Sequence, residues 1–358
     1  MTDVKHQPVT GRSAWRGADL RSNTDWIRPF TSAELSEIDA AVRKVEQEGL
    51  DFVDITPELF PLPGMHTALA QIADELENGR GMIMLRGLPL EYDPRRLNLA
   101  YWGIGVHLGV PVAQSPRGEF LQEVKDYGES VELTKSRGSR TTRALPFHAD
   151  RCDVVGLLCV RPASSGGASR VVSATAIHNA ILARSDGLID VFYDSFFQSR
   201  QGEEPPGEAP YFPQPIFNMY EGRFTGQFSP AYIRYAQLIP GCPPLTARQE
   251  EALEVFEQLS DELSLDMDFR PGDIQFLNNH LMYHARTEFR DDADSARKRL
   301  LLRLWLSMPN NRALPAAYAV TWGKTGAGEI RGGIPPRVES ARDVVAERAR
   351  RQQKASTT

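Results

Sequence analysis

Between residues 145 and 160 the chain reads LPFHADRCDVVGLLCV, a short polar stretch followed by an apolar run. The run of Val, Leu and Cys predicts a buried strand that begins near Val154. His148 and Asp150 stand two positions apart just before it, and residues two apart on an extended strand point to the same face. An imidazole and a carboxylate at this spacing can therefore bind one metal ion at the mouth of a sheet.

A third ligand is available in residues 271–286, which read PGDIQFLNNHLMYHAR. This stretch predicts a turn, a short apolar strand and a polar turn that leads back to His284. Two histidines and one carboxylate on one face of an octahedral ion leave its other positions open, as non-haem Fe(II) oxygenases require. An H-x-D triplet arises easily by chance among seven histidines. The agreement of three local contexts nevertheless predicts that His148, Asp150 and His284 are the metal ligands and the catalytic centre.

Two arginines follow in residues 299–306, which read RLLLRLWL. Arg299 and Arg303 are four apart, so on a regular strand both side chains would face the same side. A guanidinium group offers a planar fork of donors that matches a carboxylate, which makes each arginine a candidate anchor for an anion. For Arg303 an equal alternative is a structural ion pair with a nearby Asp or Glu.

The order GD, apolar strand, N-x-x-x-x-H-x-R and R-x-x-x-R resembles the Fe(II)/2-oxoglutarate dioxygenases of the taurine dioxygenase and clavaminate synthase type. The resemblance covers most of the chain and implies iron bound by His148, Asp150 and His284. It also implies that the position of His280 faces solvent. For the other histidines, which lack any partner spacing, we expect packing or surface roles; they are His6, His66, His107 and His178.

The same resemblance implies how the organic ligands bind. It places the far carboxylate of 2-oxoglutarate on Arg299, assisted by the hydroxyl of Ser169, which follows the turn Gly166-Gly167. The family more often has Thr at that last position. Arg303 would then bind the primary substrate through a carboxylate, sulfonate or phosphate group.

The implied activity is oxygenation with Fe(II), 2-oxoglutarate as co-substrate and O2, which releases succinate and CO2. We expect hydroxylation of an unactivated C–H bond in a small anionic metabolite, either amino acid-like or a natural-product intermediate. Desaturation, epoxidation and cyclisation use the same protein ligands and stay open, whereas halogenation is disfavoured because related halogenases lack the carboxylate that Asp150 supplies. The alternatives are a zinc-dependent hydrolase and a non-catalytic metal-binding jelly roll. Neither alternative needs Arg299 or the Gly-Gly turn.

Composition fits a soluble enzyme. The 358 residues carry a net charge of −6, with 41% hydrophobic and 25% charged residues, which allows a sizeable core and gives no basic field for nucleic acid. The three cysteines form no C-x-x-C pair and are expected to be reduced thiols. The polar start has no signal-peptide core, and no long apolar run suggests a membrane span. We therefore expect a cytoplasmic protein with a small-molecule partner, and the sequence leaves a homo-oligomer open.

For the fold we expect a mainly β protein with α additions, in which a double-stranded β-helix (jelly roll) core is flanked by helices. Residues 1–358 would form a single elaborated domain, with residues 1–30 as an arm held by Trp15 and Trp26. Residues from about 326 to 358 would form a peripheral tail, helical near 342–351. Helices are expected from the capping box at Thr31, from about Met65, from Asp93 and from Thr246. The polar segment 128–144 is either a surface connection or a lid over the site.

Overall fold

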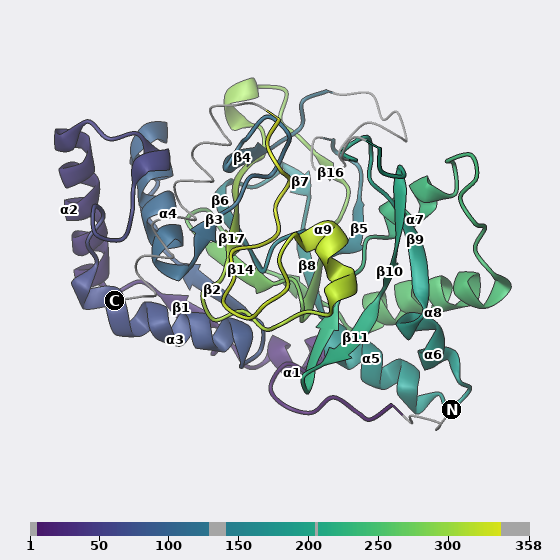
Figure 1. Ribbon diagram of the computed structural model, residues 1–358. Helices are drawn as coiled ribbons and strands as arrows, with labels where there is room; N and C mark the ends of the chain where they lie inside the picture. Colours follow the sequence, from purple (N-terminus) through teal and green to yellow (C-terminus); the bar gives the residue numbers. More distant parts are fainter. Residues whose placement is uncertain (1–5, 129–140, 205–206, 338–358) are drawn as a thin grey trace.

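The computed structural model describes residues 6–128, 141–204 and 207–337. Two sheets form its centre (Figure 1). The larger has the strand order β1-β2-β14-β6-β17-β3, and β4 also pairs with β17. Its strands are β1 (Ile27–Pro29), β2 (Met82–Arg86), β3 (Val110–Pro111), β4 (Leu121–Val124), β6 (Val154–Arg161), β14 (Ile274–Asn278) and β17 (Leu300–Ser307).

The smaller sheet is antiparallel and has the order β13-β8-β15-β5. Its strands are β5 (Leu145–His148), β8 (Ser169–Ser173), β13 (Leu265–Met267) and β15 (Met282–Arg286). Three two-stranded ribbons complete the β structure: β9 (Ser195–Ser199) with β10 (Tyr211–Pro215), β11 (Phe217–Tyr220) with β12 (Arg223–Gly226), and β7 (Ser165–Gly166) with β16 (Phe289–Arg290).

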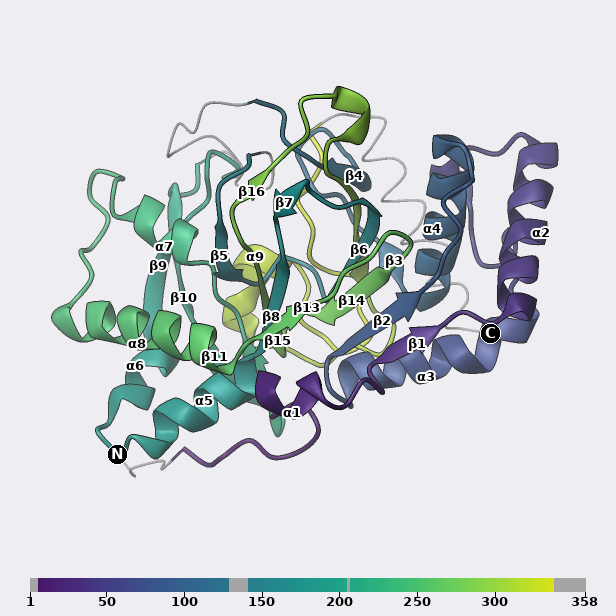
Figure 2. The same ribbon diagram turned by 180° about the vertical axis from the view of Figure 1, so that it is seen from behind.

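Helices cover both sheets from opposite sides (Figures 1 and 2). Helices α2, α3 and α4 lie beside the larger sheet, and α5 to α8 lie beside the smaller one. The helices are α1 (Gly17–Arg21), α2 (Ser32–Glu48), α3 (His66–Glu77), α4 (Pro94–Leu108), α5 (Ala174–Ala183), α6 (Leu188–Tyr193), α7 (Pro230–Ala236), α8 (Ala247–Leu263) and α9 (Ala319–Trp322). Single 3-10 turns occur at Phe52–Asp54, Pro63–Met65, Ser295–Arg297 and Ala316–Tyr318. None of the helices in the described part of the chain has the length and apolar character needed to cross a bilayer.

The helix starts follow the capping residues that the sequence predicts. Thr31 accepts from the backbone N–H of Glu34, whose side chain accepts from the N–H of Thr31, and α2 ends at Gly49 with a left-handed φ of 67°. Thr246 and Gln249 form the same reciprocal capping box at α8, whereas the Asp93 side chain caps α4 by accepting from the backbone N–H groups of Arg95 and Arg96. The observed helices begin at these residues because each cap satisfies backbone donors that the helix itself leaves unpaired.

Residues 6–30 pack more closely than an irregular arm. Trp15 and Trp26 are buried as expected, and the intervening chain forms α1. The strand β1 then pairs in parallel with β2 and so forms one edge of the larger sheet.

The described part of the C-terminal segment also differs from a peripheral tail. Arg331 and Ile334 are buried, and Arg331 contacts the larger sheet through Ser307. The expected helix at 342–351 and most of the expected lid, residues 129–140, lie outside the described residues.

Candidate metal centre

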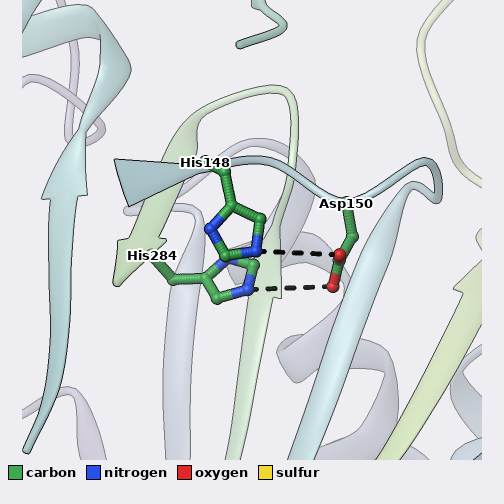
Figure 3. A group of neighbouring side chains, drawn as sticks. All are labelled: His148, Asp150 and His284. Carbon is green, nitrogen blue, oxygen red and sulfur yellow. Dashed lines mark ion pairs between the residues drawn. The ribbon is translucent and has the colours of Figure 1, made fainter. Parts of the chain in front are cut away.

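His148, Asp150 and His284 converge at one point between the two sheets (Figure 3). Their ligand atoms all lie within 4.8 Å of one another. Nε2 of His148 is 3.9 Å from Oδ1 of Asp150, and Nε2 of His284 is 3.7 Å from Oδ2. The two histidines stand directly opposite each other on β5 and β15, with ring centroids 4.3 Å apart. The structure therefore brings together the three residues that the sequence predicts as ligands.

Asp150 reaches this point by a route that differs from strand alternation. Strand β5 ends at His148, so the carboxylate lies in the connection to β6. Two contacts hold it in place. The backbone N–H of Asp150 donates to Oδ1 of Asn279 at 2.9 Å, and the indole N–H of Trp305 donates to Oδ2 of Asp150 at 3.0 Å. The two residues that the even spacing pairs thus lie together, but tertiary hydrogen bonds position the carboxylate.

A hydrogen bond prepares His148 to bind a metal through Nε2. Nδ1 of His148 lies 2.9 Å from the carbonyl oxygen of Pro146, which fixes the proton on Nδ1 and leaves Nε2 as a free acceptor. Burial lowers the pKa of His284 to about 3, and the neighbouring His148 acts in the same direction. His284 is therefore neutral at pH 7, the state that metal binding requires.

The carboxylate of Asp150 is ionised. Burial alone would raise its pKa, but Arg303 and the two histidines outweigh burial and hold the pKa below its usual value. Two imidazoles and one carboxylate aimed at one point match the ligand set of a non-haem Fe(II) site with open positions. The residues present therefore fit an iron ion.

Arg303 lies beside this centre and is held by amides. Its Nη1 is 3.7 Å from Oδ1 of Asp150, while Nε donates to Oε1 of Gln114 at 2.7 Å and Nη2 donates to Oε1 of Gln122 at 2.8 Å. The guanidinium also stacks over the indole of Trp305, 5.0 Å from the ring centroid. Neutral partners leave most of its positive charge available for an anion.

Arg299 is 3% exposed and precedes β17. The pairing of β17 with β6 shifts register between Leu300 and Leu301, where β6 has one extra residue. Nη1 of Arg299 has no hydrogen-bond partner among the described residues. Burial lowers its pKa to about 10, which still leaves the group charged at pH 7.

Ser169 begins β8 and is buried. It lies opposite Arg286 in the register of β8 and β15, and Val171 lies opposite His284. Opposite residues and residues two apart share a face of the sheet, so Ser169 and His284 do as well. Arg286 was given no role from the sequence, although its place in the H-x-R triplet, two residues after His284, was a usable signal.

A cavity of about 210 Å³ opens at the metal centre. Its described lining includes Asp150 and Arg303 together with Arg143, Arg151, Gln201 and Tyr232. Arg151 is paired with Glu203 at 3.6 Å, and its guanidinium lies 5.1 Å from the centroid of the Tyr232 ring. Among the described lining residues Asp150 is the one carboxylate, so the cavity is electropositive.

A second buried polar cluster lies next to the metal centre along the chain. Asp153 accepts from Arg331 at 2.8 Å, from Asn311 at 2.7 Å and from the backbone N–H of Met308 at 2.9 Å. Nε2 of His280 lies 2.9 Å from Oδ1 of the same carboxylate. His280 is fully buried, so the expectation that its position faces solvent is wrong. The side chain turns inward because Asp153 satisfies its ring nitrogen there.

Comparisons with known proteins agree with this geometry. The family model described as "Taurine catabolism dioxygenase TauD, TfdA family" matches residues 46–305. The chain is 33% identical over 338 residues to FR-33289 synthase from Streptomyces rubellomurinus, covering 91% of this chain and 98% of that protein.

Solved structures share the fold. Asparagine oxygenase in complex with Fe(II), 3-hydroxyasparagine and succinate matches with a TM-score of 0.63 and 19% identity, over 82% of this chain and 98% of that one. The non-haem iron oxygenase OrfP with Fe and alpha-ketoglutaric acid matches with a TM-score of 0.58 and 14% identity, over 84% of this chain and all of that one.

Proposed function

Because this chain belongs to the TauD/TfdA family of dioxygenases, we propose that it hydroxylates an unactivated C–H bond of a small anionic metabolite. It is an Fe(II)- and 2-oxoglutarate-dependent oxygenase, and O2 is its oxidant. When bound, iron and 2-oxoglutarate together activate O2 for attack on a C–H bond and release succinate and CO2. The side chains of this protein bind the reactants, orient them and keep water out.

In this proposal His148, Asp150 and His284 hold the iron on one face and leave the opposite face for the co-substrate and O2. The observation that carries the assignment is the convergence of their ligand atoms within 4.8 Å. A zinc-dependent hydrolase would use the same three ligands, but it gives no role to the buried guanidinium of Arg299, whose Nη1 has no partner among the described residues. The same objection applies to a structural metal site.

We assign Arg299 and Ser169 to the far carboxylate of 2-oxoglutarate. Arg299 is buried and still charged, and one of its terminal nitrogens has no acceptor among the described residues. A carboxylate would supply that acceptor, and a hydroxyl on the strand next to His284 would add a further donor.

The primary substrate is proposed to bind in the cavity of 210 Å³, with an acidic group on Arg303. Arg303 has only amide partners and a more distant contact to Asp150, so it keeps charge for a carboxylate, sulfonate or phosphate. The product in the asparagine oxygenase structure, 3-hydroxyasparagine, supports an amino acid-like substrate for this chain, with a natural-product intermediate as the other member of the class.

We also propose that residues 1–358 form one elaborated domain with a double-stranded β-helix core. Support comes from the two sheets, of which the smaller carries both histidines and the larger carries Trp305 against Asp150, and from the solved oxygenases that share the fold. In this view the helices on both sides are additions that cover the outer faces of the sheets.

The test is an anaerobic titration of the protein with Fe(II) and then 2-oxoglutarate, followed by a screen of anionic metabolites for O2-dependent succinate release. We expect iron to bind at one equivalent and succinate to form faster with a true substrate. Turnover supported by zinc without O2 would instead establish the hydrolase. A third outcome is that iron binds, but no metabolite gives succinate and 2-oxoglutarate is not consumed slowly in the absence of substrate. That result would argue for a structural metal site.

A further inference from the structure

Arg286 is a buried cation on β15 to which no role has been assigned. It follows His284 by two residues and lies opposite Ser169 on β8. Residues at these positions share one face of a sheet. The Arg286 side chain therefore leaves the strand on the same face as a metal ligand and the candidate co-substrate hydroxyl.

The guanidinium of Arg286 is short of acceptors. Its side chain is 6% exposed, and Nη2 donates to the carbonyl oxygens of Thr141, at 2.7 Å, and Arg143. Nε and Nη1 have no hydrogen-bond partner among the described residues. A buried donor without an acceptor destabilises the fold, and more so when the group is charged. Such a deficit in a folded protein indicates a ligand that supplies the acceptors.

Nη1 of Arg299 also lacks a hydrogen-bond acceptor among the described residues, and both guanidiniums lie near the ring of Phe289. The guanidinium carbon of Arg286 is 4.7 Å from the centroid of Phe289, and that of Arg299 is 5.2 Å from it. Within the described residues no carboxylate forms an ion pair with either guanidinium. The carboxylate of Asp291 acts on the charge of both guanidiniums from a longer distance, and its Oδ1 accepts from the backbone N–H of Arg299. Two buried cations near one ring repel each other. One carboxylate bound between them would therefore offset the uncompensated charge of both.

We propose that Arg286 is a second guanidinium that binds the far carboxylate of 2-oxoglutarate, together with Arg299 and Ser169. The proposal rests on the proposed function and extends it to a co-substrate site with two arginines. Two residues along a strand span about 7 Å. That spacing suits a five-carbon diacid whose keto-acid end lies at the metal beside His284.

The same side chain joins the two ligand sites. Arg286 holds the carbonyls of Thr141 and Arg143, and both of these residues line the cavity beside the metal. A co-substrate bound to Nε and Nη1 would fix the guanidinium and, through Nη2, this part of the substrate cavity wall. Arg286 would thus be a co-substrate-binding residue that also positions the wall.

The test measures binding to Mn(II)-loaded protein by isothermal titration calorimetry without turnover. The two probes are 2-oxoglutarate and 2-oxopentanoate, which has a methyl group in place of the far carboxylate. We expect Arg286→Gln and Arg299→Gln each to raise the Kd for 2-oxoglutarate at least tenfold, while the Kd for 2-oxopentanoate changes less than twofold. The matched control is Arg170→Gln, because Arg170 follows Ser169 in sequence but pairs with Asp261 and Asp266, and its variant should bind both acids as the wild type does.

Equal 2-oxoglutarate affinity in Arg286→Gln and the wild type would overturn the proposal. An equal loss for both keto acids would also overturn it, because that result means a structural role alone. If Arg286→Gln fails to fold by circular dichroism, Arg286→Lys serves the same comparison and should show a selective loss for 2-oxoglutarate. A wild type that binds Mn(II) but no 2-oxoglutarate would refute the proposed function itself, which separates the two failures.

Discussion

The indole N–H of Trp305 donates a hydrogen bond of 3.0 Å to the Asp150 carboxylate. Trp305 belongs to β17 in the larger sheet, whereas His148 and His284 belong to β5 and β15 in the smaller sheet. The metal centre thus draws its two imidazoles from one sheet and the support of its carboxylate from the other. Any change in the packing of the two sheets would alter the distance between these ligands.

Trp305→Phe should lower Fe(II) affinity while the protein stays folded. The ring still packs, but Asp150 loses the donor that orients its carboxylate, and changes of this kind cost about 10–100-fold in metal affinity. Competition with a fluorescent chelator measures the effect. Trp322→Phe is the matched control, because Trp322 is also buried but its indole N–H has no partner among the described residues. Unchanged affinity in Trp305→Phe would show that Asn279 alone is enough to place the carboxylate.

Replacing any metal ligand should abolish iron binding and O2-dependent succinate formation. His148→Ala, Asp150→Ala and His284→Ala each remove one of three ligands and should leave a folded protein by circular dichroism. Asp150→Gly is a separate case, since two histidines and a bound anion are able to retain some iron. Full activity in any one of the alanine variants would remove that residue from the site.

Substitutions of Arg299 and Arg303 should affect the kinetics of different reactants. Arg299→Ala should raise the KM for 2-oxoglutarate steeply, by about 3–5 kcal/mol when converted to free energy, the cost of truncating one member of a desolvated charge pair. Arg299→Lys keeps the charge but loses the planar fork of guanidinium donors, so its use of 2-oxoglutarate should also be impaired. Arg303→Ala should instead weaken the primary substrate while 2-oxoglutarate consumption without substrate persists. The reverse pattern would mean that the roles are exchanged.

The sequence predicted the parts of the site that local patterns encode. His148 and His284 each stand beside a recognisable strand or turn, and the helix caps at Thr31, Asp93 and Thr246 lie where they were expected. The contacts that orient Asp150 were not predictable in this way. Asn279 is 129 residues away and Trp305 is 155 residues away, so only tertiary pairing brings them to the carboxylate.

The expectation that Arg299 and Arg303 face the same side stays a prediction, because Arg299 precedes β17. The expectation for His280 was wrong: the resemblance implied a position that faces solvent, yet the side chain pairs with Asp153, which is 127 residues away. Buried polar pairs of this kind follow no periodic pattern, because each is fixed by a single distant partner.

The buried pair of His280 and Asp153 gives the fold a pH dependence. Burial lowers the pKa of His280 to about 4, although its hydrogen bond to Asp153 acts in the opposite direction. Burial would raise the pKa of Asp153, but His280, Arg331 and the backbone of Met308 hold it at about 2, so Asp153 stays ionised above that pH. Between its ordinary value of 6.5 and about 4, His280 is therefore protonated in the unfolded chain but neutral in the folded one.

The unfolded state binds the extra proton between pH 6.5 and about 4, so the free energy of unfolding should be highest above this window and fall as the pH is lowered through it. His280→Gln keeps a donor for Asp153 but cannot titrate, so its free energy of unfolding should fall less over the same interval. Urea unfolding of the metal-free wild type and variant at several pH values measures the difference. Comparing the two cancels the contribution of His284, which titrates abnormally in both. Parallel pH profiles for the two proteins would contradict the assignment and show that His280 is not the group whose protonation destabilises the fold.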